Sequence, residues 1–428
     1  MEVLRYGSEG NGVLLAQLAL KRAGYYKGEF DGVFGTRTLN AVRRLQTAEG
    51  LAPDGVYGKK TAERAEPFLL GARQVSVRPG DTLYKLARRY GTSLAAVETA
   101  NPGVDPKRLM PGQTVTVPLG FELVPRGIPF SSALAEYVIR GLALRYPFIA
   151  VGSIGASVLG RPIRTLTMGE GSKSVFISAA YHANEWITAP LIMSFIERYA
   201  MAFSAGGSIC GADARELYGK AGLYAAPMVN PDGVDLVTGA FAPASPEYRA
   251  AAAIAEDYPE IPFPEGWKAN IAGTDINLNF PADWEAARGI KYAAGFTRPA
   301  PRDYVGSEPL SAPEARAVAG FTVKKEFDAV LAFHTQGEVI YWRYGELEPK
   351  GGYEIGTRLA HASGYKLDDV PEFSSCAGYR DWFIQEYGRP GYTVEAGKGV
   401  NPLPTAQFDE IASACFPLIA EAMRAISE

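Results

Sequence analysis

The feature that most constrains this chain is a histidine and a glutamate three residues apart, His182 and Glu185, which directly follow an apolar run at 174–178. The run predicts a buried β-strand that breaks at Ala179-Ala180, just before the pair. In open α/β folds, ligands bind at the carboxyl edge of the sheet. Imidazole nitrogen and carboxylate oxygen both suit Zn²⁺. The stretch therefore predicts part of a zinc site at a sheet edge.

Two further apolar runs end in residues that would complete such a site. The run at 330–333 ends in His334, which we expect at the same sheet edge as a third ligand. Two histidines and one glutamate leave zinc a fourth position for water, as in catalytic sites. The run at 392–394 ends in Glu395, whose uncommitted carboxylate is the predicted general base. His361 lies in a polar segment and is predicted to be a surface residue.

The length and pattern of the chain predict several domains, with an α/β fold in the largest. The 428 residues exceed the roughly 250 to 300 that one hydrophobic core supports. From residue 120 to 428, strand-like and helix-like segments alternate. The strand-like segments are 174–178, 223–227, 328–333 and 392–394, and the helix-like ones are 187–200, 312–324 and 409–427. The Pro- and Ala-rich stretch 241–269 is predicted to form surface loops around a cleft.

Composition narrows the possible partners and the compartment. The formal net charge is -4, with 43 Lys+Arg against 47 Asp+Glu, so no basic excess favours nucleic acid. The odd number of scattered cysteines argues against a disulfide framework and predicts buried free thiols at Cys210, Cys376 and Cys415. Neither a leader sequence nor a run of about 20 apolar residues is seen. We therefore expect no membrane partner and a cytoplasmic or spore-associated protein.

Residues 1–70 contain an internal repeat, in which the turn at 31–38 returns at 54–61. Each turn leads into a helical pattern, and Thr38 is placed to cap the helix that follows it. The segment resembles the peptidoglycan-binding domain of bacterial wall hydrolases, which implies a small three-helix fold. A generic helical dimerisation module is the alternative.

Residues 73–118 predict a strand, two helices and a closing strand, with Asp81 as the cap of the first helix. The motifs Pro79-Gly80-Asp81-Thr82-Leu83, Ala100-Asn101-Pro102 and Pro111-Gly112-Gln113 follow in order. This βααβ segment resembles a LysM domain, which implies binding to glycans that contain N-acetylglucosamine. Two wall-binding modules in tandem would raise the effective concentration on a polymer.

Residues 120–428 carry motifs in the order of the zinc metallocarboxypeptidase family, which they resemble. The motifs are His182-x-x-Glu185, Asn230-Pro231-Asp232-Gly233, Gly273-Thr274-Asp275-Ile276-Asn277, His334-x-x-Gly337 and Thr393-Val394-Glu395. The resemblance implies a mixed sheet flanked by helices and one Zn²⁺ per chain, held by His182, Glu185 and His334. It also implies that Glu395 is the base and that Asp275 fixes the tautomer of His182. Lys268 stands where the family has an arginine, and can stabilise the oxyanion.

Departures from the family pattern bear on the substrate. Asn277, an expected substrate-binding residue, is followed by Leu278 instead of the arginine that clamps a C-terminal carboxylate. Phe373 stands at the position of the family's mobile tyrosine, so that hydroxyl is missing unless Tyr379 supplies one from the same loop. Arg380 falls at the base of the specificity pocket and favours a side chain that carries a carboxylate. The alternative for Arg380 is a surface salt bridge.

Two segments, 273–285 and 395–404, resemble in particular the bacterial γ-D-glutamyl-diaminopimelate peptidases of this family. The resemblance implies hydrolysis of the γ-D-glutamyl to meso-diaminopimelate bond in peptidoglycan stem peptides, with Arg380 facing the side-chain carboxylate of diaminopimelate. Two alternatives stay open at this point. One is a metallocarboxypeptidase that removes a C-terminal residue from stem peptides or proteins, and the other is an inactive wall-binding protein.

Overall fold

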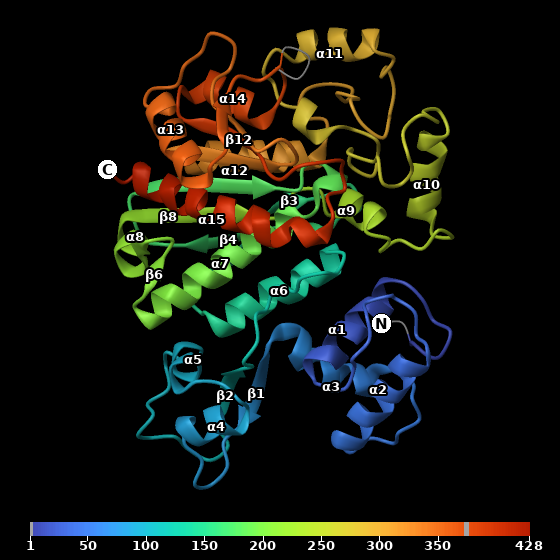
Figure 1. Cartoon of the computed structure of the whole chain (residues 1–428), viewed down its shortest axis with the longest axis vertical. Helices are drawn as coiled ribbons and strands as arrows, with labels where there is room; N and C mark the ends of the chain where they lie inside the picture. Colours follow the sequence, from blue (N-terminus) through green and yellow to red (C-terminus); the bar gives the residue numbers. More distant parts are fainter. Residues whose placement is uncertain (1–2, 372–375) are drawn as a thin grey trace. The chain divides into compact units, whose positions relative to one another are not determined.

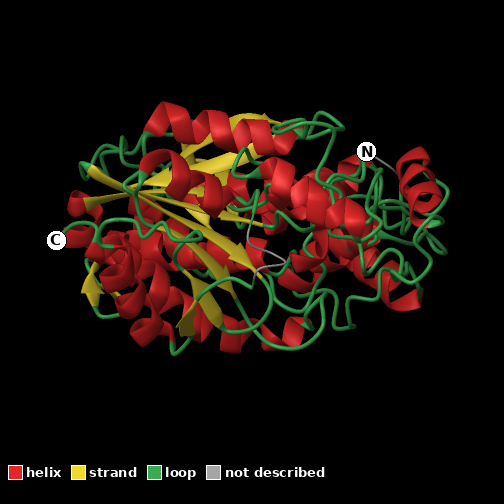
Figure 2. Ribbon diagram, turned by 90° about the horizontal axis from the view of Figure 1, so that it is seen from above, coloured by secondary structure: helices red, strands yellow, loops and turns green. Residues whose placement is uncertain are grey.

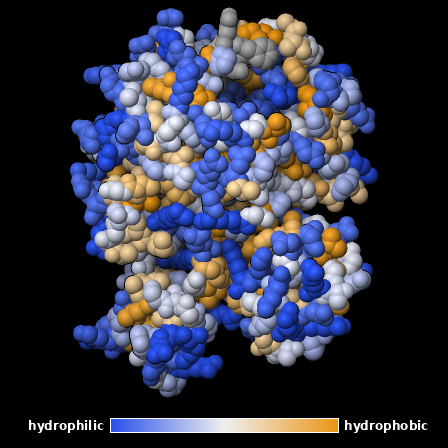
Figure 3. Space-filling view, viewed as in Figure 1, coloured by the Kyte–Doolittle hydropathy of each residue, from blue (hydrophilic) through white to orange (hydrophobic). Residues whose placement is uncertain are grey.

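A computed structural model describes residues 3–371 and 376–428 of the chain. The chain splits into two compact units, Met1–Ile128 with Ala133–Ala150, and Pro129–Ser132 with Val151–Glu428. This division does not test the boundaries expected from the sequence, which stay predictions. Among the described residues, no helix is both long and apolar enough to cross a membrane. Hydrophilic residues predominate on the face drawn in Figure 3, where hydrophobic ones occur in small groups.

The first unit begins with the three helices that the repeat predicts, α1 (Asn11–Arg22), α2 (Thr36–Ala48) and α3 (Lys59–Leu70) (Figure 1). Each repeated turn is held by a glutamine from the preceding helix. The amide of Gln17 donates to Asp31 Oδ1 at 2.6 Å and its oxygen accepts from Gly32 N at 3.2 Å. Gln46 bonds in the same way to Asp54 and Gly55. The repeat in sequence is therefore a repeat in hydrogen bonding.

The cap predicted at Thr38 is wrong. Helix α2 already begins at Thr36 after Gly35, which makes no side-chain cap bond. The hydroxyl of Thr38 instead donates to Val33 O at 3.3 Å and accepts from the amide of Gln17 at 3.2 Å. Thr38 thus belongs to the bonding of the turn.

The second part of the first unit has the predicted βααβ order. Its elements are β1 (Ala72–Ser76), α4 (Leu83–Arg89), α5 (Leu94–Thr99) and β2 (Thr114–Pro118), with β1 and β2 antiparallel. The cap predicted at Asp81 is wrong, because the hydroxyl of Thr82 accepts from Lys85 N at 3.1 Å. Asp81 instead accepts from Arg78 N and pairs with Arg89. Helix α6 (Ser132–Arg145) follows.

The described part of the second unit contains an eight-stranded mixed sheet with the order β11-β10-β12-β9-β5-β8-β4-β3 (Figures 1 and 2). Strands β12, β9, β5 and β8 run parallel at its centre, while β10 and β4 are antiparallel to their inner neighbours. In chain order the strands are β3 (Ala150–Ala156), β4 (Pro162–Met168), β5 (Lys173–Ala179), β8 (Ala221–Ala226), β9 (Ala329–His334), β10 (Val339–Tyr341), β11 (Lys366–Asp368) and β12 (Gly391–Glu395). The predicted mixed α/β sheet is confirmed.

Helices lie on both sides of this sheet (Figure 2). The three predicted ones are α7 (Thr188–Ala205), α12 (Pro313–Lys325) and α15 (Phe408–Ala425). Helices α12 and α14 (Tyr379–Tyr387) pack in one core cluster with Phe176 of β5 and Val330 of β9. The remaining helical elements are η1 (Ala183–Glu185), α8 (Ala214–Lys220), α9 (Pro231–Val237), α10 (Pro246–Ala255), η2 (Ile276–Leu278), α11 (Trp284–Ala293), α13 (Gly352–Ser363) and η4 (Thr405–Gln407), and β6 (Ser208–Ile209) pairs with β7 (Ala212–Asp213).

Two sequence-based expectations need correction here. The stretch 241–269 is not loop throughout, because α10 occupies part of it, with Ala251 and Ala255 buried in a small apolar cluster. The three cysteines are free, as expected, but only Cys415 is buried; Cys210 is exposed and Cys376 is intermediate.

Candidate active site

The two halves of the predicted zinc site meet where adjacent parallel strands end. Strand β5 stops at Ala179, and Ala180 turns the chain with a left-handed backbone (φ 50°). His182 then precedes the short η1 helix, which ends at Glu185. His334 is the last residue of β9, whose register pairs Phe333 with Ala179. The sheet therefore brings these three side chains together from positions about 150 residues apart.

The three side chains lie close enough together to share one metal ion. His182 Nδ1 lies 2.9 Å from Glu185 Oε1, and His334 Nδ1 lies 3.0 Å from Glu185 Oε2. The two Nδ1 atoms are 3.2 Å apart. A tetrahedral ion with bonds of about 2.0 to 2.2 Å keeps its ligand atoms about 3.3 to 3.6 Å apart. The cluster can thus hold one metal ion, and it is the only such group among the described residues.

Asp275 orients the first of these histidines. Its Oδ1 lies 3.2 Å from His182 Nε2. When Nε2 donates its hydrogen to Asp275, the lone pair on Nδ1 points into the cluster. Burial disfavours the charged carboxylate, but His182 and Lys268 outweigh that effect and lower the pKa of Asp275 well below its usual value. Asp275 is therefore a fixed negative charge behind His182.

Further groups hold Glu185, and sequence reasoning missed two of them. The backbone N–H of Thr335 donates to Glu185 Oε2 at 3.2 Å, and Asn401 Nδ2 lies 3.4 Å from Oε1. Asn401 is itself tied to Thr335, whose hydroxyl donates to its Oδ1 at 2.7 Å. Lys268 Nζ lies 3.1 Å from Glu185 Oε1. Asn401 lies in the segment 395–404, which the sequence analysis singled out. The sequence alone does not show that Asn401 contacts Glu185.

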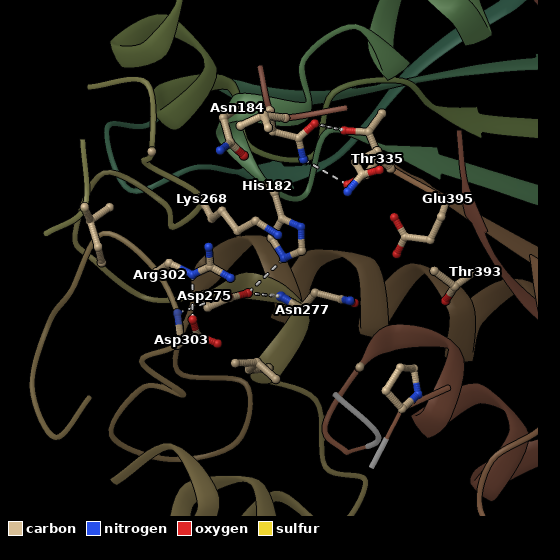
Figure 4. A pocket seen from close by; sticks show the side chains of 18 of the residues that line it. His182, Asn184, Lys268, Asp275, Asn277, Arg302, Asp303, Thr335, Thr393 and Glu395 are labelled. Atoms are coloured by element: carbon tan, nitrogen blue, oxygen red, sulfur yellow. Dashed lines mark hydrogen bonds and ion pairs between the residues drawn. The ribbon is translucent and has the colours of Figure 1, made fainter. Parts of the chain in front are cut away.

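Glu395 ends strand β12 and pairs in register with His334 on the neighbouring strand. Figure 4 shows its carboxylate pointing across the cleft towards His182, and no hydrogen bond joins it to the other described residues. Burial raises the pKa of Glu395 to about 8, and the charge of Glu185 adds to the rise, against the opposing effect of Lys268. A cation held by the cluster would counter the effect of Glu185. Glu395 is thus a free carboxylate beside the candidate metal site.

A cleft of about 660 Å³ opens over the cluster (Figure 4). The stretch 241–269 borders it through residues between Glu260 and Lys268, as the sequence suggested. Asn277 also lines the cleft, and its Oδ1 accepts from Tyr379 N at 3.1 Å. Leu278 lies in the cleft wall at the position where an arginine would form a carboxylate clamp.

Arg380 lines the cleft and is not the surface residue of the alternative reading. Only 3% of it is exposed, and its Nε donates to Asp381 Oδ1 at 2.9 Å. Its Nη1 is buried without a hydrogen-bond partner among the described residues. Against the larger effect of burial, its positive charge lowers the pKa of Glu395 and of Tyr341, and both residues also line the cleft. The cleft therefore contains a buried cation with an unused donor.

The substrate-facing hydroxyl predicted for Tyr379 is wrong. Tyr379 is fully buried at the start of α14, and its hydroxyl lies 2.8 Å from Thr322 Oγ1 of α12. Its ring packs against Tyr181 and Phe280 in the core. Phe373, which stands at the position of the mobile tyrosine, lies outside the described residues. Among the described residues, Tyr341 of β10 is the tyrosine that lines the cleft.

Comparisons with known proteins match all three parts of the chain. The zinc carboxypeptidase family matches residues 135–414, the putative peptidoglycan binding domain matches residues 9–64, and the LysM domain matches residues 75–118. Among curated proteins, the chain is 45% identical over 273 residues to gamma-D-glutamyl-L-diamino acid endopeptidase 1 of Lysinibacillus sphaericus, which covers 64% of this chain and 67% of that protein. It is 38% identical over 287 residues to the uncharacterized protein YqgT of Bacillus subtilis, with 67% and 74% covered.

A solved structure shares the fold. Bovine thrombin-activatable fibrinolysis inhibitor, in complex with tick carboxypeptidase inhibitor, superposes with a TM-score of 0.54 and 18% sequence identity. The match covers 71% of this chain and 98% of that one. At this identity the likeness concerns the fold alone.

Proposed function

The chain belongs to the zinc carboxypeptidase family, and from that premise we propose that it hydrolyses the γ-D-glutamyl to meso-diaminopimelate bond of peptidoglycan stem peptides. The enzyme is a zinc-dependent metallopeptidase. The observation that carries the choice of substrate is Arg380, a buried cation with a free donor in the cleft. The name of the Lysinibacillus sphaericus relative, which describes cleavage between γ-D-glutamyl and a diamino acid, supports it.

Each residue around the cluster has its own role in the proposed hydrolysis. His182, Glu185 and His334 would hold the zinc ion, which would supply a positive charge that acidifies water and polarises a carbonyl. Glu395 accepts a proton from the attacking water as its oxygen bonds to the scissile carbonyl carbon. It returns that proton to the leaving nitrogen as the carbon–nitrogen bond breaks, which releases the amine. Lys268, whose ammonium group lies at the cluster, stabilises the oxyanion.

Arg380 fits the leaving group of this reaction. The leaving amine receives its proton from Glu395, so the residue that departs lies on the Glu395 side of the cleft. Arg380 lines the same cleft as Glu395, and its Nη1 is buried there without a hydrogen-bond partner among the described residues, which supports this assignment. Diaminopimelate differs from lysine by a carboxylate at the end of its side chain. A buried guanidinium with an unused N–H is a suitable partner for that carboxylate.

The two N-terminal modules suit a polymeric substrate. The LysM and peptidoglycan-binding matches support binding to cell-wall peptidoglycan. We assign the glycan strands with N-acetylglucosamine to these modules and the stem peptides to the cleft. Attachment to the polymer raises the effective concentration of stem peptides at the catalytic domain. The modules thus supply recruitment without taking part in the chemistry.

The two alternatives are less well supported. A carboxypeptidase acting on ordinary C-termini needs a carboxylate clamp, and Leu278 stands where the arginine of that clamp would be. An inactive wall-binding protein has no need for a closely spaced ligand cluster with a free carboxylate beside it. Both features are present here.

We predict that replacing diaminopimelate with lysine in a stem tripeptide lowers kcat/KM of the wild-type enzyme roughly 10- to 100-fold, the usual effect of losing a charge-assisted hydrogen bond. Arg380→Ala removes the cation and should erase most of this preference. The measurement is kcat/KM for the two matched peptides with both enzymes. Arg249→Ala, an exposed arginine of α10 outside the cleft, is the control and should keep the wild-type preference. An equal kcat/KM of the wild-type enzyme for the two peptides would refute the proposal that Arg380 binds the side-chain carboxylate of diaminopimelate.

A further inference from the structure

A second arginine, Arg302, faces the cleft at the end away from Glu395. Arg302 lies in the loop between α11 and α12, and no motif in the sequence singled it out. In Figure 4, Arg302 and Glu395 lie on opposite sides of His182, and Lys268 lies between Arg302 and the cluster. Arg302 is thus a cation of the cleft on the side of His182 away from Glu395.

The backbone around Arg302 is pinned on both sides. Pro301 O accepts from Lys268 N at 2.7 Å and from Ala269 N at 2.9 Å. Tyr304 O accepts from Asp275 N at 2.8 Å. The loop is therefore tied to the segment of Lys268 and to the residue that orients His182. Such ties fix the position of Arg302 relative to the candidate metal site.

The side chain of Arg302 is also positioned, yet its outer donors are unused. Its Nε donates to Asp303 Oδ2 at 2.6 Å. Lys291 Nζ pairs with the other oxygen of Asp303 at 2.7 Å, so Asp303 is shared between two cations. The two Nη atoms have no hydrogen-bond partner among the described residues, and 42% of the side chain is exposed. This leaves the end-on fork of the guanidinium open to a carboxylate.

The order of groups along the cleft decides which part of a substrate meets Arg302. The leaving amine takes its proton from Glu395, so the leaving residue occupies that side. The acyl part of the scissile amide then extends the other way, past Lys268 towards Arg302 (Figure 4). A γ-linked glutamyl residue is joined through its side chain, and its α-carboxylate stays free a few carbon atoms from the scissile carbonyl. An anion is thus expected on the acyl side.

We propose that Arg302 binds the free α-carboxylate of the γ-linked glutamyl residue and so selects the acyl side of the substrate. The inference rests on the proposed function and adds a second specificity-determining residue to it. In an α-linked peptide the corresponding carboxyl is consumed in the scissile bond, and in an isoglutaminyl stem it is a neutral amide. Neither offers the guanidinium fork an anion at this place. Arg302 and Arg380 would then read one carboxylate on each side of the scissile bond.

The test compares two stem tripeptides that contain meso-diaminopimelate and differ only in the α-group of the glutamyl residue, a free carboxylate or a carboxamide. The full-length zinc enzyme should show a kcat/KM roughly 10- to 100-fold higher for the carboxylate peptide. Arg302→Gln should lower kcat/KM for the carboxylate peptide by a similar factor and leave the carboxamide peptide nearly unchanged. Arg302→Lys, which keeps the charge without the fork, should restore part of the preference.

Arg298→Gln is the matched control, since Arg298 is exposed, pairs with Asp257 and does not line the cleft. It should keep the wild-type preference. Equal wild-type efficiency on both peptides would overturn the inference while leaving the proposed function standing, and this result requires no variant. If Arg302→Gln lowered kcat/KM equally for both peptides, the only role left for Arg302 would be to position Asp303. That result would also overturn the inference. Cleavage of neither peptide by the wild type would overturn the proposed function, and this inference with it.

Discussion

Glu395→Gln is expected to lower kcat/KM on a diaminopimelate stem peptide by a factor on the order of 10² to 10⁴, the usual contribution of a general base. The substitution keeps the shape of the side chain but removes the carboxylate that accepts the proton. The three proposed ligands are untouched, so zinc content should stay at about one per chain. Steady-state kinetics and metal analysis on the same preparation measure both effects.

The control for this variant is Glu386→Gln, which changes an exposed glutamate of α14 that does not line the cleft. It should retain wild-type activity and zinc. Near-normal turnover by Glu395→Gln would assign the base to another residue. Loss of zinc from Glu395→Gln would show that Glu395 acts in binding the metal, contrary to its assigned role.

His334→Ala is expected to remove both zinc and activity. It leaves two of the three protein ligands that a catalytic zinc site needs. His334 is buried, with its Nδ1 at 3.0 Å from Glu185 and 3.2 Å from His182, so another side chain cannot take its place without rearrangement. Metal analysis after dialysis should find well under one zinc per chain. His182→Ala should behave in the same way.

The chain offers a matched control in its third histidine, His361. This residue is exposed on α13 and lies outside the metal-ligand cluster, as the sequence predicted. His361→Ala should retain the full zinc content and wild-type turnover. Full zinc occupancy in His334→Ala would contradict the assignment of the ligands.

The centre of the fold could be predicted because long apolar runs identify buried parallel strands. The runs that end before His182 and at His334 and Glu395 became β5, β9 and β12, and their common edge placed the three residues together. Strands β10 and β11, at one side of the sheet, were missed because three residues give too short a pattern. Helix α10 was missed because proline and alanine in its region suggested loop, although proline occupies its first turn.

The errors in the predicted site concern the direction in which side chains point and the contacts between residues that are far apart in the sequence. Tyr379 and Arg380 are adjacent in sequence, but one points into the core and the other into the cleft, because they lie at the start of a helix packed on the sheet. Local sequence does not reveal that difference. Arg302 was missed for another reason: its position depends on backbone bonds to residues some thirty positions away. The turns of the N-terminal repeat likewise depend on Gln17 and Gln46, which lie outside the repeated motif.

The most direct test of the central claim is mass spectrometry of the stem tripeptide L-alanyl-γ-D-glutamyl-meso-diaminopimelate, and of the tetrapeptide with a further D-alanine, after incubation with the zinc enzyme. Cleavage at the γ-D-glutamyl bond yields the dipeptide L-alanyl-D-glutamate from both, with free diaminopimelate from the first and diaminopimelyl-D-alanine from the second. We expect the dipeptide from at least one of the two substrates. Release of D-alanine from the tetrapeptide with the γ-D-glutamyl bond intact, and no dipeptide from either, would contradict the account and identify a carboxypeptidase.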